Sequence, residues 1–206
     1  MNTVTTTDHY HRDDRLLAWA DQVRASCVPM AFRTESDQGF RGELSSVTTG
    51  GVCVSRISAV DHVAAHDWDD VRRTADDYLL VSIQTEGRGA IEQDARTAFV
   101  GPTDMVLFDS SRNFVWHFSG QHYTIRFPRQ ALEKLVPCGR QHTAVRIPAA
   151  TGIRRIAADH VASLHRALSS DEGAMTGCER LGAAPYAPLP LPAALPVVIV
   201  SVPASL

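Results

Sequence analysis

The sequence predicts a mainly β fold built as an antiparallel meander, sandwich or barrel. Leu79, Val81 and Ile83 alternate with the residues between them, which is the period of two of a pleated strand. Five further short segments with turn signals between them follow. The six predicted strands are residues 79–84, 91–93, 97–100, 105–108, 114–118 and 123–127. Such a run of short strands is typical of all-β folds, and a closed sheet can hold one small ligand inside.

Glycine, proline and aspartate mark the turns between these strands. Gly87-Arg88-Gly89 is interpreted as a hairpin turn, because glycine reaches positive φ without steric cost. Asp94-Ala95 and the Gly-Pro-Thr-Asp sequence at residues 101–104 are interpreted as the next two turns. The close spacing of these signals favours antiparallel neighbours along the chain.

A tail, a helix, a hairpin and a loop are expected before this region. Residues 1–11 are predicted to form a flexible tail, and residues 13–25 an amphipathic helix with Asp13 or Asp14 as its N-cap. Residues 40–47 and 52–57 alternate as two strands of a hairpin. Residues 59–76 are rich in aspartate and are predicted to form a polar loop.

Two helices are predicted after the strands. Residues 128–135 form a short helix with proline in its first turn, where the missing N–H costs little. Residues 151–168 form a longer amphipathic helix. Its apolar stripe contains Ile153, Ile156, Ala157, His160, Val161, Leu164 and Leu168. This helix either packs on its own barrel or contributes to a dimer interface.

Composition indicates an ordinary cytoplasmic protein with one core. The chain has 206 residues, a formal net charge of −3 and 44% hydrophobic residues. This balance gives no electrostatic sign of nucleic-acid binding, and no segment suggests export or a membrane span. Its four cysteines are widely spaced, and we expect them to be reduced and mostly buried.

Five short motifs in order carry a family resemblance: RRTADDYLL, the GRG turn, IEQDARTA, GPTDMVLFDSSR and FPRQAL. This order resembles the amino-terminal, AraC-binding-like half of AraC-type transcription regulators, over residues 15–137 and most strongly over 72–132. The resemblance implies a cupin-like antiparallel β-barrel with flanking α-helices at residues 12–172, which binds a small-molecule effector and dimerises. It also implies a carboxy-terminal half with helix-turn-helix units, which this chain does not supply.

The chain changes character at residues 173–206. Residues 181–206 contain no charged side chain and six of the eleven prolines, which exclude a regular helix. We expect a Pro-rich disordered tail here. One hypothesis is that a frameshift or early stop has truncated the regulator before its DNA-binding half. A helix-turn-helix coding sequence in another reading frame downstream would support it, and its absence would contradict it. We expect no direct DNA binding from this chain.

The sequence contains no strong motif for catalysis or metal binding. His62 and His66 are spaced as metal ligands on a helix would be, but a solvated loop is the simpler reading. Metal-binding cupins carry a His-x-His pair with a glutamate and a third histidine, and His117 and His122 do not match that pattern. Ser110 and Ser111 lie in no nucleophile elbow. We therefore expect no enzymatic activity, no metal and no cofactor.

A binding pocket inside the barrel remains as the predicted functional site. Such cavities are mostly apolar and aromatic, with a few polar groups that set specificity. The candidate ligand-binding residues are Gln84, Trp116, Tyr123 and Arg126. The prediction is a small-molecule-sensing and dimerisation domain that pairs with itself or with related regulators, whose DNA binding it could block. The alternative is a cupin-type enzyme acting on a small organic molecule, which stoichiometric iron, manganese or zinc would reveal.

Overall fold

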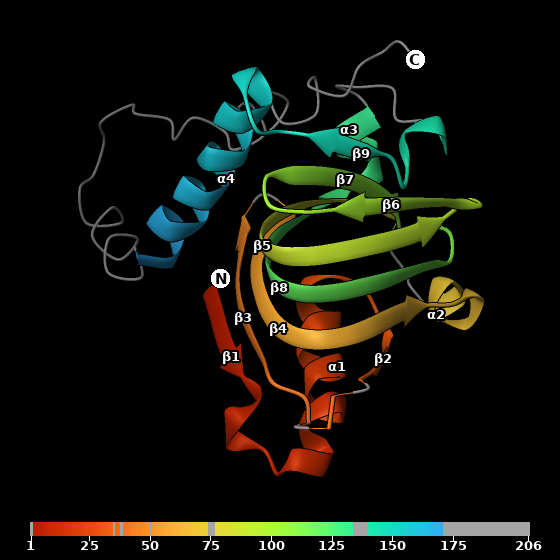
Figure 1. Cartoon of the computed structure of the whole chain (residues 1–206), viewed down its shortest axis with the longest axis vertical. Helices are drawn as coiled ribbons and strands as arrows, with labels where there is room; N and C mark the ends of the chain where they lie inside the picture. The colour runs from red at the N-terminus through yellow and green to blue at the C-terminus, as the bar shows by residue number, and fades with distance from the viewer. Residues whose placement is uncertain are drawn as a thin grey trace, which may run out of the picture.

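The computed structural model describes residues 2–34, 36–37, 39–49, 51–73, 77–133 and 140–170. Its strands are β1 Asn2–Thr6, β2 Ala31–Arg33, β3 Gly42–Thr49, β4 Val52–His66, β5 Tyr78–Gln93, β6 Arg96–Val100, β7 Asp104–Asp109, β8 Phe114–Pro128 and β9 Arg146–Pro148. Its helices are η1 Thr7–His9, η2 Arg12–Asp14, α1 Arg15–Ser26, α2 Trp68–Arg73, α3 Arg129–Glu133, η3 Arg140–His142 and α4 Gly152–Ser170. The predicted fold class, an antiparallel β-barrel with flanking α-helices, is confirmed (Figure 1).

The strands of the described chain pair in the order β1-β3-β4-β8-β5-β7-β9, with β2 added to β4 and β6 added to β5. The three long strands β4, β5 and β8 bend and so belong to two half-sheets. Half-sheet A contains β1, β3, β7, β9 and residues 52–59, 78–84 and 121–128. Half-sheet B contains β2, β6 and residues 62–66, 87–93 and 114–120.

Two facing glycines allow this bend. Gly87 and Gly120 are paired across β5 and β8, with φ values of 76° and 111°. A Cβ atom on Gly87 would lie 2.2 Å from the Ser119 carbonyl oxygen, and one on Gly120 would lie 2.2 Å from the Glu86 carbonyl oxygen. Only glycine permits both this conformation and this approach.

This arrangement corrects two predictions. The sequence predicts a turn at Gly87-Arg88-Gly89, but β5 continues through it as a bent strand with a register shift between Gln84 and Glu86. The predicted strands 114–118 and 123–127 are likewise one strand, β8. The physical reason is that a positive φ in a long strand produces a bulge and a bend, which has the same sequence signal as a turn.

The ends of the long strands also differ from expectation. Residues 59–66 are the second part of β4, not a loop, and only Trp68–Arg73 leave the sheet, as α2. His62 and His66 are buried on β4 and point into the barrel. Residues 2–6 are not a flexible tail, because β1 pairs along β3 and the Thr7 hydroxyl accepts a hydrogen bond from the Gly42 N–H at 2.9 Å.

The predicted helices are confirmed with small differences at their ends. Helix α1 begins after Asp14, whose side chain makes no capping hydrogen bond. Helix α3 begins at Arg129, one residue after the proline that the sequence places in its first turn. Helix α4 confirms the predicted helix at residues 151–168: it begins one residue later and ends two residues later. The predicted tail 173–206 lies outside the described residues.

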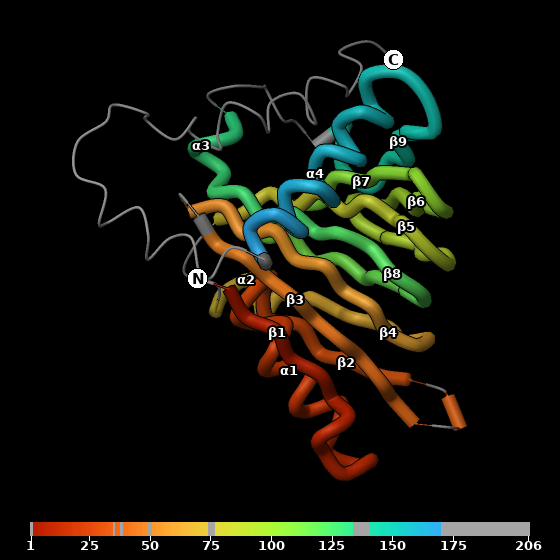
Figure 2. Tube along the Cα trace, turned by 90° about the vertical axis from the view of Figure 1, so that its left-hand side faces the viewer, coloured from red at the N-terminus to blue at the C-terminus, as the bar shows by residue number. Residues whose placement is uncertain are grey.

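Two hydrophobic cores lie on opposite faces of half-sheet A. The inner core fills the space between the two half-sheets and is closed by α1. The outer core lies beneath α4 and α3, on the other side of the sheet from α1 (Figure 2). Cys27 and Cys53 are buried free thiols, as expected, whereas Cys138 and Cys178 lie outside the described residues. Because both faces of half-sheet A are covered, neighbouring residues on its strands belong to different cores.

We predict that replacing Gly120 with valine will destabilise the fold by about 3 kcal/mol or more, since the backbone must leave both its positive φ and its contact with Glu86. Urea denaturation measures the change. Gly101→Ala is the matched control, because its Cβ would meet only the Asp104 carboxylate, at 3.9 Å. An equal free energy of unfolding in Gly120→Val and wild type would show that the bend does not depend on glycine.

Candidate functional site

A small cavity of about 40 Å³ lies inside the barrel. Helix α1 and the segment after it form one wall, and inward-facing residues of β4, β5, β7 and β8 form the others. The lining residues are Trp19, Val23, Cys27, Met30, Phe32, Ile57, His62, Ala64, Leu80, Phe108, Phe114, Trp116, His122 and Thr124. By this measure a single water needs roughly 10–15 Å³, so the cavity is small and most of the interior is filled by side chains.

Aromatic rings surround two histidines in this interior. The ring centroid of His62 lies 5.3 Å from that of Phe40 and 5.4 Å from that of Phe118, both edge to face. The His122 ring lies 4.2 Å from Phe118 and 5.6 Å from Trp116. Edge-to-face rings attract through their quadrupoles, so these contacts hold both imidazoles in place.

Besides Arg126 Nε at the end of the interior, four buried polar atoms around it have no hydrogen-bond partner within the described chain. They are Trp19 Nε1, Trp116 Nε1, His122 Nδ1 and Gln84 Oε1. The Gln84 side-chain nitrogen donates to the Glu86 carbonyl at 2.6 Å, which leaves its oxygen free. Buried polar groups are nearly always paired, because an unpaired one costs roughly 1–3 kcal/mol. Trp19, Trp116 and His122 line the cavity, and Gln84 lies opposite His122, so the interior has hydrogen-bonding capacity that the described side chains do not use.

Both interior histidines are neutral at pH 7. Burial is the main cause and the neighbouring His62 a smaller one of the low pKa of His122, which is about 3. Burial also lowers the pKa of His62, although a hydrogen bond to Val60 opposes this. The Nδ1 of His62 lies 2.8 Å from the Val60 carbonyl oxygen, which can only accept, so Nδ1 carries the proton. The two imidazoles therefore contribute polarity but no charge.

Two of the four predicted ligand-binding residues meet in this interior. Trp116 lines the cavity, and Gln84 is buried opposite His122 on the same face. Arg126 lies at the end of the interior, where it donates to the Cys27 carbonyl at 2.7 Å and stacks over Tyr78. Tyr123 is elsewhere: it belongs to the outer core and packs on His165 of α4, with ring centroids 5.5 Å apart.

Sequence reasoning missed Trp19, His62 and His122 as lining residues. Trp19 belongs to a helix whose packing partner the pattern did not reveal. His62, Ala64 and His66 alternate with the half-buried Val63 and Ala65, which is a strand period. That alternation could have identified the second half of β4.

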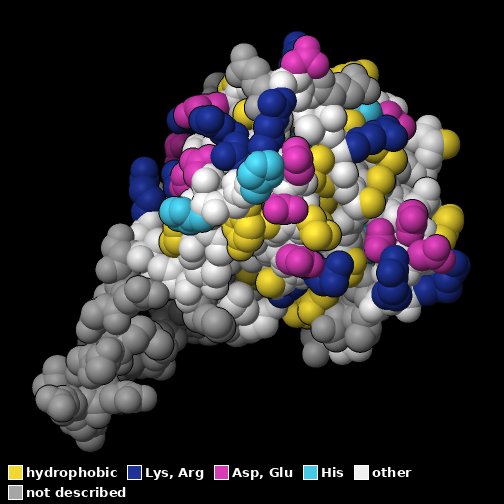
Figure 3. Space-filling view, turned by 90° about the horizontal axis from the view of Figure 1, so that it is seen from below, with side chains coloured by type: hydrophobic (Ala, Val, Ile, Leu, Met, Phe, Trp, Pro, Cys, Tyr) yellow, Lys and Arg dark blue, Asp and Glu magenta, His cyan; other side chains and the backbone are white. Residues whose placement is uncertain are grey.

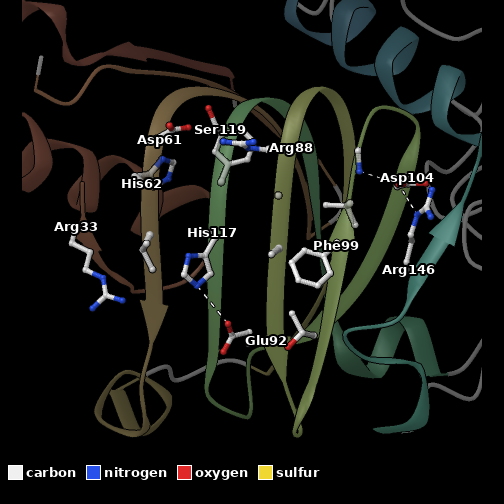
Figure 4. A pocket seen from close by; sticks show the side chains of 17 residues that line it. Arg33, Asp61, His62, Arg88, Glu92, Phe99, Asp104, His117, Ser119 and Arg146 are labelled. Carbon is white, nitrogen blue, oxygen red and sulfur yellow. Dashed lines mark hydrogen bonds and ion pairs between the residues drawn. The ribbon is translucent and has the colours of Figure 1, made fainter. Parts of the chain in front are cut away.

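A second, open depression of about 870 Å³ crosses the opposite face of half-sheet B (Figure 4). Most of the side chains labelled there are charged or polar and come from different strands. Glu92 and His117 point toward one another at 3.6 Å, and Arg146 pairs with Asp104 at 2.7 Å. His62 lines both this depression and the interior cavity, so its side chain forms part of the wall between the depression and the cavity.

Surface charges are mixed on the face seen from below, where acidic and basic side chains are interspersed with apolar ones (Figure 3).

In the described part of the chain, no group of three His, Cys, Asp or Glu residues is arranged to hold a metal ion. His62 and His66 point inward on β4 and use their Nδ1 atoms on different carbonyls. No described helix combines the length and the apolar character needed to cross a bilayer.

Comparisons with known proteins agree with this geometry. A family model for the AraC-binding-like domain matches residues 19–184. An uncharacterised protein encoded in the 5′ region of nit in Bacillus sp. (strain OxB-1) is 29% identical over 134 residues, 64% of this chain and 52% of that protein. This chain thus spans about half the length of that curated relative.

Among solved structures, the AraC-like transcriptional activator CuxR matches with a TM-score of 0.64 and 16% identity, over 98% of this chain and 68% of that one. At this identity the match shows the fold alone, which is cupin-like as predicted. Ectoine synthase from P. lautus matches at a TM-score of 0.33 and 14% identity, over 42% of this chain and 69% of its own, too weakly to bear on function.

We predict that the protein loses stability on acidification below pH 6.5 and that His122 contributes to this loss. The unfolded chain binds a proton at His122 near pH 6.5, whereas the folded chain does so only near pH 3. Protonation in this window therefore favours the unfolded state, by at most about 1.4 kcal/mol per pH unit.

Urea denaturation of His122→Gln between pH 5 and 7 should show a smaller dependence of the unfolding free energy on pH. His9→Gln, which changes an exposed histidine, controls for the loss of a surface imidazole. If His122→Gln keeps the wild-type dependence, the imidazole of His122 is not excluded from protonation in the fold.

Proposed function

This chain belongs to the AraC-binding-like domain family, and on that premise we propose that its barrel senses a small-molecule effector for an AraC-type transcription regulator. The observation that carries the proposal is the set of four buried, unpaired polar atoms around the interior cavity. A ligand with hydrogen-bonding groups would satisfy them, and it would be enclosed by aromatic rings, as small-molecule sites usually are.

The proposed route from effector to response begins at α1. Trp19 is fully buried, and its ring contacts Phe40 and Phe32 at centroid distances of 5.3 and 6.4 Å. Because the cavity is small, an effector larger than a few atoms has to displace side chains, and α1 supplies one whole wall. Movement of α1 would then report that the interior is occupied.

We further propose that α4 takes part in dimerisation. Its inner face, with Ala157 and Val161, is buried against the barrel, whereas Ile153 and Ile156 are 55% and 63% exposed. Exposed apolar side chains that lie together commonly mark an interface. The partner is a second copy of this chain or a related regulator.

DNA recognition falls to helix-turn-helix units, which the described barrel and helices do not contain. The domain would act in the cytoplasm, where such regulators meet DNA. If this chain functions without a DNA-binding half, pairing with full-length relatives would interfere with their DNA binding. The truncation itself stays a hypothesis.

The sensing proposal is tested by a binding screen of small metabolites followed by Trp116→Phe. This substitution keeps most of the ring volume, but removes the unpaired indole N–H that lines the cavity. It should weaken binding of the effector by about tenfold, the worth of one hydrogen bond, while changing the melting temperature of the free protein little.

Tyr123→Phe is the matched control, since Tyr123 packs under α4 and should leave the affinity unchanged. Equal affinity in Trp116→Phe and wild type, beside a clear loss of stability, would make Trp116 a plain core residue. A broad screen without any binder would contradict the sensing role.

We predict a weak homodimer that forms in the micromolar range and requires the exposed edge of α4. Sedimentation equilibrium should show dissociation for the double variant Ile153→Glu, Ile156→Glu, because charges cannot be buried unpaired at the interface. Leu17→Glu on α1, also exposed in the monomer at 70%, is the control and should dimerise as wild type. Wild-type protein that is only monomeric at high micromolar concentration would contradict the proposal.

A further inference from the structure

We propose that the interior site selects uncharged effectors that carry both a hydrogen-bond acceptor and a donor, such as carboxamides, over carboxylates and sugars. The inference rests on the proposed sensing function and names the chemical class that this interior accepts. It follows from the charges, the polar atoms and the size of the cavity, which are independent observations.

The first observation is the absence of charge in the lining. No Asp, Glu, Lys or Arg is among the described residues that line the cavity. Its two histidines are kept neutral by burial, which lowers the pKa of both. An ionised ligand would lose its hydration without meeting an opposite charge, and that loss is large in an apolar site. The interior therefore discriminates against ions.

The second observation is the chemistry of the unpaired atoms. An indole N–H can only donate, so Trp19 and Trp116 require an acceptor on the ligand. The Gln84 Oε1 atom can only accept, so it requires a donor. His122 Nδ1 takes either role, according to its tautomer. A carboxamide supplies the acceptor and the donor on one planar group.

The small number of unpaired polar atoms in the interior also disfavours sugars. A sugar carries a hydroxyl on nearly every carbon, and each one needs a partner when it is buried. The mostly apolar lining offers three unpaired atoms, on Trp19, Trp116 and His122, and Gln84 opposite His122 offers a fourth. Most hydroxyls of a sugar would therefore be buried without a hydrogen bond, which costs more than the aromatic contacts return.

Arg126 is the cation whose charge could compensate that of an anionic ligand in the interior. Its contacts argue against that role. Its Nη1 donates to the Cys27 carbonyl at 2.7 Å, and its guanidinium lies 4.6 Å from the Tyr78 ring centroid. It does not line the cavity. Its Nε atom is buried and unpaired, so the experiment includes an outcome that depends on Arg126.

The third observation is size. At about 40 Å³ the cavity accommodates a group of a few heavy atoms, and a larger ligand requires outward movement of the α1 wall. The test therefore uses a size series. Three pairs of nearly equal shape differ in charge: acetamide and acetate, butyramide and butyrate, benzamide and benzoate.

The experiment titrates the full chain with each pair at pH 7.5, where the carboxylates are ionised, and follows tryptophan fluorescence and the melting temperature. We expect at least one amide to bind and its carboxylate partner to bind at least about tenfold more weakly. Trp116→Phe should lower the affinity for that amide, and Tyr123→Phe should leave it unchanged.

A carboxylate that binds as tightly as its amide would overturn the proposed class. Loss of that binding in Arg126→Gln would then identify Arg126 as the counter-charge, and sensing would stand. Binding of a sugar at the site, reported by Trp116, would also overturn the class while leaving sensing intact. Failure of all three amides overturns the class as well. The sensing function fails only if the broader screen, with its sugars and organic acids, also finds no binder.

Discussion

The close contact between the backbones of Gly87 and Gly120 is the constraint on which the rest of the structure depends. A Cβ on either glycine would lie 2.2 Å from the carbonyl oxygen of the residue before the other glycine. Because both have positive φ, β5 and β8 bend together at this point and β4 follows them with its own register shift between Ala59 and His62. Half-sheet B is thereby turned toward half-sheet A. Without this bend the inner residues would face solvent, and no interior would exist.

The bend also decides how the residues of half-sheet A are shared between two cores. All six residues of β7 are buried. Val106 and Phe108 belong to the inner core, whereas Met105 and Leu107 belong to the outer core. Strand β8 separates its aromatic residues in the same way. Trp116 enters the interior, and Tyr123, beyond the bend, lies under α4. A response transmitted by α4 would therefore pass through the sheet rather than through direct contact with a ligand.

A buried cluster of charges lies at one end of the barrel, outside the interior cavity. Asp109 is buried at the end of β7, where Arg112 and Arg129 both pair with it. Burial raises the pKa of Asp109, but hydrogen bonds from Arg112 and Ser111 outweigh this and hold it below its usual value. Buried carboxylates need such partners to remain ionised. This network satisfies its own charges, and the cavity is lined by neutral groups.

The sequence by itself determined the antiparallel β class and the helices α1 and α4. Those features depend on local periodicity, which a pattern of neighbouring residues records directly. Tertiary structure alone decided that Gly87 bends a strand instead of ending it, because a bulge and a turn share the same glycine signal. It also decided that His62 and His122 face inward and that Tyr123 faces α4. Which side of a strand becomes the inside depends on the contact between two glycines 33 positions apart, and no local pattern contains that information.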